Sequence, residues 1–242
     1  MTYQMPRPEQ KARYVRGKFD EIARKYDLFN DLITQGQHRL WKRTLVKRLE
    51  LKSGSRGADL CCGTGDIAFR LMNRVGAEGS VVAMDFSLGM LETARERLGR
   101  TSSGGRVGLL TGDAMRLPLA TASLDFVTIG YGLRNVSDLD ECLREILRVL
   151  KPGGVMGSLD VGQVRSPLIR PFSDFYLFRI VPLIGGLLQK NQDMFSYLPH
   201  STKDYPPQQE LKRRMESLGF ERVEVLEYVF GASAIHLARK PG

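Results

Sequence analysis

From Ala58 onward, short apolar runs typical of β-strands alternate with helical patterns, and this alternation constrains the fold more than any other feature. Strands that alternate with helices at this spacing form βαβ units, whose strands lie parallel in one sheet. The expected strands cover residues 58–62, 80–86, 106–113, 123–130 and 155–161. Helices are expected at about residues 66–74, 87–98 and 137–150, and Ser137 with Asp140 has the spacing of a capping box. We therefore predict an α/β fold built on a parallel sheet.

The C-terminal part departs from this alternation. Two strand patterns, at residues 220–230 and 233–240, follow one another almost directly. A parallel crossover needs a dozen or more residues, so these two strands are expected to pair as an antiparallel hairpin. Before them, residues 167–188 are apolar, aromatic and helical in pattern, and a helix at residues 207–217 ends at Gly219. We predict a mostly parallel seven-stranded sheet that ends in an antiparallel strand.

The N-terminal quarter has a different character. Residues 9–50 read as two or three helices joined near Asn30 and Gly36, and residues 1–56 hold 14 Lys or Arg against 6 Asp or Glu. Such a basic segment suggests an anionic partner, unless it is simply a solvated helix face. We divide the chain into a basic helical cap at residues 1–52 and a second domain at residues 53–242, which carries a helical insertion at about residues 166–205.

The composition excludes several classes of protein. With 242 residues, 42% of them hydrophobic and 26% charged, the chain can bury a large core and is neither disordered nor collagen-like. Three cysteines, two of them adjacent at Cys61 and Cys62, give no disulfide framework and no metal-ligand spacing, so we expect reduced thiols and no metal. Residues 168–188 are interrupted by charges and prolines, which argues against a spanning helix. We expect a soluble, cytoplasmic protein.

A glycine turn follows the first expected strand directly. Gly63, Gly65 and Ala68 satisfy the G-x-G-x-x-G/A pattern of dinucleotide binding, so an NAD enzyme has to be considered. Small residues at such a turn let a ligand approach the backbone, and the next helix offers unpaired N–H groups. Taken alone, the pattern does not discriminate between nucleotide-containing cofactors.

Carboxylates at the ends of three expected strands narrow the choice. Asp85 could bind both hydroxyls of a ribose, and Asp113 with the backbone of Ala114 suits the edge of an adenine ring. Asp59 precedes the glycines at the expected mouth of the site, where it would repel a pyrophosphate but could receive an ammonium group. The set favours S-adenosylmethionine over NAD as the cofactor.

Specific motifs then extend over essentially the whole chain: VRGKFDEIARKYDLFNDLITQGQHRLWKR at 15–43, DLCCGTGD at 59–66, MDFSLGML at 84–91, GDAMRLPL at 112–119, GYGLRNVSD at 130–138 and LREILRVLKPGG at 143–154. In this order they resemble the class I S-adenosylmethionine-dependent methyltransferases, and more narrowly the ubiquinone/menaquinone biosynthesis C-methyltransferase family. The resemblance implies a Rossmann-like fold and methyl transfer to a ring carbon of a prenylated quinol. The cofactor-binding residues expected on this basis are Asp59, Gly63, Thr64, Gly65, Asp85, Phe86, Asp113 and Ala114.

Two departures from the family pattern bear on the substrate. Gly130 stands where ubiquinone-type members often have a serine, and Ala238 replaces an expected glycine in the terminal strand. Gly130 and the compact N-terminus together favour demethylmenaquinol as the substrate. The alternatives are the ubiquinone-pathway 2-polyprenyl-6-methoxy-benzoquinol, both quinols, a class I methyltransferase for RNA or a soluble small molecule, or a non-catalytic prenyl-quinol-binding accessory protein.

The expected catalytic residues follow the strand at 123–130. Ring carbon is a poor nucleophile unless the adjacent hydroxyl loses its proton, and arginine itself is practically never deprotonated. We expect Arg134 to stabilise the developing phenolate, with Asn135 or Tyr131 orienting it or a water. The alternative for Arg134 is an ordinary surface ion pair, and His38 is a weaker candidate for a base.

A substrate with an isoprenoid tail implies contact with a membrane. The basic N-terminal helices could attract anionic lipid, and residues 175–188 could line a tail channel or lie against the bilayer. We expect a cytoplasmic enzyme that is peripheral at the inner face of the cytoplasmic membrane. No nucleic-acid partner is expected, and a homodimer is compatible with the sequence.

Overall fold

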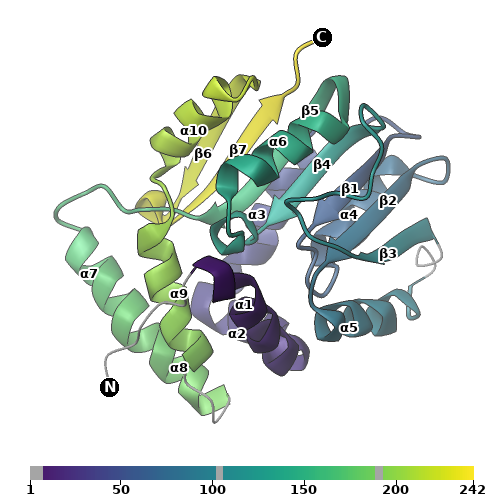
Figure 1. The fold of residues 1–242 in the computed structure, drawn as a ribbon. Helices are drawn as coiled ribbons and strands as arrows, with labels where there is room; N and C mark the ends of the chain where they lie inside the picture. Colours follow the sequence, from purple (N-terminus) through teal and green to yellow (C-terminus); the bar gives the residue numbers. More distant parts are fainter. Residues whose placement is uncertain (1–7, 102–105, 189–192) are drawn as a thin grey trace.

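The computed structural model describes residues 8–101, 106–188 and 193–242, which form a seven-stranded sheet with helices on both faces (Figure 1). The strands are β1 (Arg56–Leu60), β2 (Ser80–Asp85), β3 (Val107–Thr111), β4 (Leu124–Gly130), β5 (Leu150–Val161), β6 (Glu221–Tyr228) and β7 (Ser233–Arg239), in the order β3-β2-β1-β4-β5-β7-β6. The first five strands are parallel, and β7 is antiparallel to both β5 and β6. The predicted sheet and its terminal hairpin are confirmed.

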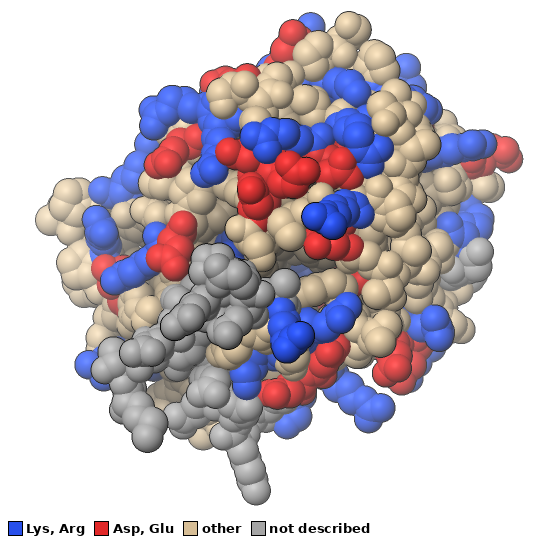
Figure 2. Space-filling view, viewed as in Figure 1, with Lys and Arg blue, Asp and Glu red and all other residues tan. Residues whose placement is uncertain are grey.

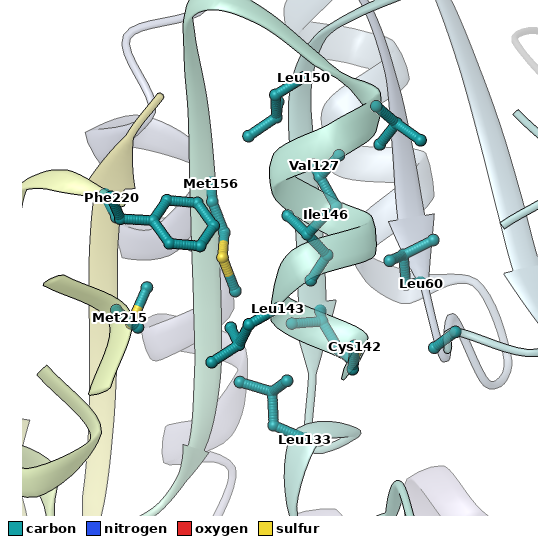
Figure 3. Packing of buried hydrophobic residues seen from close by; sticks show 14 of the residues in the cluster. Leu60, Val127, Leu133, Cys142, Leu143, Ile146, Leu150, Met156, Met215 and Phe220 are labelled. Carbon is teal, nitrogen blue, oxygen red and sulfur yellow. The ribbon is translucent and has the colours of Figure 1, made fainter. Parts of the chain in front are cut away.

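One face of the sheet is covered by α6 (Leu139–Val149) and α10 (Gln208–Ser217). Leu143 and Ile146 recur at helical spacing on α6, are fully buried, and point toward Val127 and Met156 of the sheet (Figure 3). Each such buried side chain stabilises the fold by roughly 1.5–3 kcal/mol. This packing holds the ends of β4 and β5 in place, and the candidate site lies at those ends.

The opposite face packs on α3 (Gln37–Arg48) and α4 (Asp66–Val75), with α5 (Leu88–Leu98) beside β2 and β3. The closest approach is at Gly157 of β5, where an added Cβ would lie 2.7 Å from Leu45 Cδ1 and 3.0 Å from Leu49 Cδ2 of α3. Glycine is required there because any larger residue would push α3 off the sheet. The N-terminal helices are therefore part of the core.

The cap, used from here on for Pro8–Arg48, consists of α1 (Pro8–Ile22), a 3₁₀ turn η1 (Ala23–Lys25), α2 (Tyr26–Thr34) and α3. The break expected near Gly36 is confirmed, since Gln35 and Gly36 both adopt left-handed conformations. The break expected near Asn30 is wrong: Asn30 is buried inside α2, and the chain bends instead at η1. No glycine or proline marks that bend, so the sequence carries no signal for it.

The insertion, used here for residues 166–205, contains α7 (Arg170–Phe175), a π-helix η4 (Tyr176–Ile180), α8 (Val181–Leu188) and α9 (Asp193–Asp204). It lies beside the cap and away from the sheet (Figure 1). Val181 and Tyr197 are buried against Phe19 and Phe29 of the cap. The helical expectation for residues 167–188 is confirmed, and within the described residues no helix has the length and apolar character needed to cross a bilayer.

Two expectations about α6 are corrected. Its N-cap is Asp138, whose Oδ1 accepts a hydrogen bond from the N–H of Glu141 at 3.0 Å, because Asp138 is the extended residue at this end. Ser137 is therefore not the cap. The helix ends at Val149, and β5 begins at Leu150 and not at residue 155 as expected. The pairing of β4 with β5 is irregular between Leu124 and Phe126, which pair with Leu150 and Val155.

Candidate active site

Two cavities lie at the carboxyl ends of the parallel strands, the edge at which open α/β sheets bind ligands. The first, called here the loop cavity, has a volume of about 390 Å³ and is lined by residues that follow β2, β3 and β4, with Arg13 and Arg16 of α1. The second, called here the cap cavity, has a volume of about 460 Å³ and is lined mostly by apolar side chains of the cap and the insertion.

The short segment that follows β4 separates the two cavities. Gly132 and Asn135 line the loop cavity, whereas Tyr131 and Arg134 line the cap cavity. Tyr131 has a φ of 56°, a left-handed conformation that is uncommon outside glycine and is found at functional sites. The two cavities therefore adjoin each other at this segment.

Asp85 organises the floor of the loop cavity. Its Oδ2 accepts the N–H of Gly63 at 2.8 Å, and its Oδ1 accepts the N–H of Ser87 at 2.9 Å. Burial raises the pKa of Asp85 to about 6, although the backbone donors oppose this shift. The carboxylate thus ties the glycine turn to the end of β2 and lies in the cavity wall, where a ribose would meet it.

Phe86, Asp113 and Ala114 also line the loop cavity, as expected for an adenosine site. Asp113 Oδ1 accepts the N–H of Met115 at 2.9 Å, which fixes the turn after β3. Arg16 of α1 donates from Nε to the carbonyl oxygen of Phe86 at 2.7 Å. The cap therefore closes over the adenosine end of the cavity, a contact that the sequence did not reveal.

Asp59 does not lie at the mouth of a cavity. It is buried in the sheet, where Oδ1 accepts a hydrogen bond from Thr128 Oγ1 at 2.7 Å and Oδ2 has no partner among the described residues. Burial raises the pKa of Asp59 to about 7. This carboxylate underlies the glycine turn, and its unpaired oxygen is the feature that suits a cationic group bound above it.

Gly63, Thr64 and Gly65 form the turn itself and do not line the loop cavity, although both glycines need their left-handed φ values of 55° and 83°. Thr64 Oγ1 donates to Asp27 Oδ1 at 2.9 Å, and Arg97 Nη1 bonds to both Asp27 and Thr64. The side chain of Thr64 thus links the turn to α2 and α5. A cofactor contact through Thr64 stays a prediction.

Two further cap residues reach the loops around the cavities. Lys11 Nζ donates to the carbonyl oxygens of Arg134 at 3.2 Å and Val136 at 2.9 Å. Burial lowers the pKa of Lys11. Asp20 accepts hydrogen bonds from Ser87 Oγ and from the N–H of Gly89, at the start of α5. Neither residue was predicted, because both act on loops far away in the sequence.

Arg134 forms an ion pair that is buried, so the alternative of an ordinary surface ion pair does not hold. Its Nη1 lies 2.5 Å from Asp160 Oδ1 at the end of β5, and its side chain is almost completely excluded from solvent. Although burial by itself would lower the pKa of Arg134, Asp160 holds that pKa above the usual value. The guanidinium is therefore charged and rigidly oriented, with its charge balanced by Asp160.

Three buried polar atoms without a hydrogen-bond partner among the described residues belong to residues that line the cap cavity: Asn30 Nδ2, Tyr131 Oη and Arg134 Nε. All three groups can donate a hydrogen bond. For Tyr131 this holds because burial raises the pKa of its phenol, which therefore stays protonated. Unpaired buried donors are uncommon in folded proteins, so an acceptor from a water or a ligand would be favourable at this place. The cap cavity thus combines apolar walls with a buried donor cluster.

Of the other candidates, Asn135 is positioned by its neighbours. It donates from Nδ2 to the carbonyl oxygen of Tyr131 at 3.0 Å and accepts from Tyr197 Oη at 3.1 Å. His38 lines neither cavity; it is buried against Asp31, with Nε2 2.9 Å from Asp31 Oδ1. Burial lowers the pKa of His38. The geometry gives His38 no route to a ligand in either cavity.

The loop cavity fits S-adenosylmethionine. The carboxylates of Asp85 and Asp113 accept hydrogen bonds, and the hydroxyls of a ribose and the amino group of an adenine donate them. Asp59 lines neither cavity, so a contact of Asp59 with the cofactor's amino-acid end stays a prediction. No group of three or more potential metal ligands occurs among the described residues.

Comparison with known proteins agrees with this geometry. A model of the ubiE/COQ5 methyltransferase family matches residues 7–240. The chain is 45% identical to a demethylmenaquinone methyltransferase of Leptospira interrogans, over 99% of this chain and 97% of the relative. It is 44% identical to a ubiquinone/menaquinone biosynthesis C-methyltransferase UbiE of Stenotrophomonas maltophilia, over 95% and 91%.

Solved structures share the fold. A SAM-dependent methyltransferase from Aquifex aeolicus superposes with a TM-score of 0.62 at 19% identity, over 88% of this chain and 97% of that one. This likeness confirms the class I methyltransferase architecture predicted above. Together with the full-length family match, it shows that the chain belongs to the ubiE/COQ5 methyltransferase family.

Proposed function

We propose that this protein methylates a ring carbon of a prenylated quinol, with S-adenosylmethionine as the methyl donor, and that its substrate is demethylmenaquinol. The observation that carries this proposal is the donor cluster of Asn30, Tyr131 and Arg134 in an otherwise apolar cavity. A prenylated quinol has the matching chemistry, since its hydroxyls accept hydrogen bonds and the rest of the molecule is apolar. The loop cavity on the other side of residues 131–135 holds the methyl donor.

When bound, the cofactor supplies a methyl group already activated on a sulfonium. The protein's first task is therefore to position donor and acceptor for an in-line displacement. Residues of the segment 131–135 border both cavities, so donor and acceptor have to meet beside this segment. The cap closes both cavities as well, since Arg16 lines one and Phe19 lines the other.

The second task is to make the ring carbon nucleophilic. Loss of the proton from the adjacent hydroxyl moves electron density onto that carbon, and the resulting phenolate needs donors around it. Arg134 donates from Nε, while Asp160 holds Nη1 and so fixes the direction of the guanidinium. Tyr131 and Asn30 supply two further neutral donors. In the displacement, the thioether that leaves would keep the electron pair of the broken carbon–sulfur bond. The hydroxyl proton would pass to water, the methylated carbon would then lose its own proton to water, which restores the aromatic ring, and the oxygen would be reprotonated.

A reduced, anaerobic assay with labelled S-adenosylmethionine tests this function. Demethylmenaquinol and the ubiquinone-pathway benzoquinol are offered separately, and the oxidised quinones serve as controls because they have no hydroxyl to ionise. We expect label in the naphthoquinol product. Label in both products would identify a dual-pathway enzyme, and label in neither, despite cofactor-dependent thermal stabilisation, would refute the substrate class.

The relatives favour the naphthoquinol. Proteins named demethylmenaquinone methyltransferase from Leptospira interrogans and Staphylococcus haemolyticus are 45% and 38% identical to this chain. The relative from Stenotrophomonas maltophilia carries a name that covers both quinones, so the benzoquinol is the second candidate. A purely accessory, quinol-binding role predicts no thermal stabilisation by S-adenosylmethionine, which separates it from the enzyme.

We propose further that the enzyme works at the cytoplasmic face of a membrane and docks there through its insertion. Large apolar side chains of this region are exposed, namely those of Leu168, Phe172, Phe175, Leu183 and Leu187. A surface patch of this kind adjoining an apolar cavity suits the interface of a bilayer, which is also where a prenylated quinol resides.

The positive charge of the cap contributes less to docking than the residue count suggests. Lys42 pairs with Asp66 at 3.0 Å, Arg39 pairs with Asp31, and Lys11 bonds to backbone carbonyls. Acidic and basic side chains are also mixed across the described part of the face in Figure 2. We expect co-sedimentation with neutral vesicles and only a modest gain with anionic lipid. A homodimer and the lack of a nucleic-acid partner stay predictions.

A further inference from the structure

Three large apolar side chains line the cap cavity and are exposed to solvent as well. Phe172 of α7 is 76% exposed, and Val229 and Phe230 in the turn η5 (Val229–Gly231) are 48% and 70% exposed. A side chain that borders both the cavity and the solvent lies where the two meet. These residues therefore form the mouth of the cap cavity, whereas the unpaired donor atoms of Asn30, Tyr131 and Arg134 are buried.

In the turn between β6 and β7, Val229 and Phe230 both have a strained backbone conformation. Val229 has a φ of 50° and Phe230 a φ of 57°, both in the left-handed region. That region is unfavourable for bulky residues and most unfavourable for a β-branched one, whereas glycine and asparagine adopt it readily. The chain thus keeps two apolar side chains at a position where a polar residue would fit the backbone better. Strain of this kind is typical of ligand-binding segments.

Neighbouring groups hold the turn in this shape. The buried side chain of Gln208 donates from Nε2 to the carbonyl oxygen of Gly231 at 2.8 Å. The N–H of Gly162 donates to the carbonyl oxygen of Ala232 at 2.9 Å, and the N–H of Ala232 donates to Val229 at 3.0 Å. The turn is therefore a rigid side of the mouth.

The opposite side of the mouth is held more loosely. None of the residues of α7 and η4 is buried, and a π-helical turn, a form common at functional sites, follows α7 directly. Tyr176 of η4 donates from Oη to the carbonyl oxygen of Ile33 at 2.8 Å, which ties the insertion to the cap. Phe172 precedes this tie, and its side chain is mostly exposed.

We propose that the isoprenoid tail of the quinol leaves the cap cavity between Phe172 and the turn Val229–Phe230, and that these three residues give the enzyme its preference for tailed substrates. This inference rests on the proposed function, since it concerns the tail of that substrate. Only a tail long enough to pass the mouth touches all three side chains, so their contribution grows with tail length. The ring and its hydroxyls bind at the other end and do not depend on them.

The test compares quinols with no tail and with one, two or four isoprene units, in vesicle-free buffer, using the double variant Val229→Asn/Phe230→Asn. Asparagine retains the left-handed backbone and removes the apolar surface. We expect kcat/KM for the tail-free quinol to change less than that for any of the tailed quinols. For the longest tail we expect a fall of about tenfold, mostly through KM, as apolar contact is lost.

Leu187→Asn is the matched control, because Leu187 is an exposed apolar residue of the same insertion that does not line the cavity. It should leave the dependence on tail length unchanged. An unchanged tail dependence in the double variant, or an equal loss with every quinol, would overturn the inference. Failure of the parent enzyme to methylate any of these quinols would instead refute the proposed function. Thermal unfolding verifies that the double variant is folded, and relief of the backbone strain should keep its Tm at or above the parent value.

Discussion

The two cavities are built in different ways. The loop cavity is formed largely by short stretches that directly follow β2, β3 and β4, so residues close in sequence are close in space. The cap cavity takes residues from α1, α2, the segment after β4, the insertion and the turn before β7. The loop cavity is formed by the loops at one edge of the sheet, whereas the cap cavity forms only when segments distant in the sequence pack together. Cofactor binding and substrate binding should therefore respond differently to mutation.

The largest effect is expected where the two cavities meet. Arg134→Lys keeps the positive charge but loses the Nε donor and the fixed geometry of the pair with Asp160. We expect kcat to fall by about 10²–10³, the usual consequence of losing one donor to a developing oxyanion. Cofactor affinity, measured by calorimetry, should change little. Parent-like turnover in this variant and in Arg134→Ala would remove Arg134 from the mechanism.

An intermediate effect should be confined to the loop cavity. Asp85→Asn replaces one acceptor of the Gly63 and Ser87 N–H groups with an NH₂ group that cannot accept. The dissociation constant for S-adenosylmethionine should rise roughly 10- to 100-fold, as expected for loss of charge-assisted hydrogen bonds. Quinol KM at saturating cofactor serves as the internal control. A matching rise in quinol KM would show that the cavities are coupled more tightly than their construction suggests.

A smaller effect should affect both cavities. Lys11→Met retains the apolar stem and removes the two hydrogen bonds to the carbonyl oxygens of Arg134 and Val136. We expect kcat/KM to fall about tenfold through loss of two hydrogen bonds that position the dividing segment. Lys11→Arg should recover part of this loss. If Lys11 merely stabilised the fold, Tm would fall while the kinetic constants stayed at their parent values.

The smallest effect concerns stability. The pKa of Asp59 is raised by burial to about 7, so the folded state favours the protonated form and is penalised once this carboxyl ionises. The penalty is complete above about pH 7 and disappears as the pH falls toward the unfolded value near 4. Asp59→Asn should therefore raise Tm by several degrees at about pH 8 and by little at about pH 4. Equal changes at both pH values would exclude this cause.

The same contrast explains what could be read from the sequence. The strands, their order along the chain and the terminal hairpin follow from local patterns, and Asp85, Phe86, Asp113 and Ala114 were correctly placed at one edge because they follow parallel strands. Asp160 lies near the C-terminal end of β5, just as Asp59 and Asp85 lie near the C-terminal ends of β1 and β2. This repeated position could have identified Asp160 from the sequence as a residue close to Arg134.

The cap cavity could not be predicted to the same degree. Asn30 was interpreted as a helix break, yet it lies inside α2 and supplies a donor to the cavity, because the bend occurs at η1 where no breaker residue stands. Lys11 acts on a segment more than a hundred residues away, and Asp27 joins Arg97 and Thr64 from a third element. Side-chain contacts between distant elements produce no periodic pattern in the sequence of either element. The residues that line the cap cavity can therefore be identified only from the three-dimensional structure.

The packing of α3 on β5 and β7 has a consequence for synthesis of the chain. Leu45 and Leu49 emerge from the ribosome early, but Gly157 and Leu237, against which they pack, are made much later. Until then the apolar side of α3 has no permanent partner, and long-range contacts of this kind slow folding. The apolar side of α3 therefore becomes covered only after β5 and β7 have been synthesised.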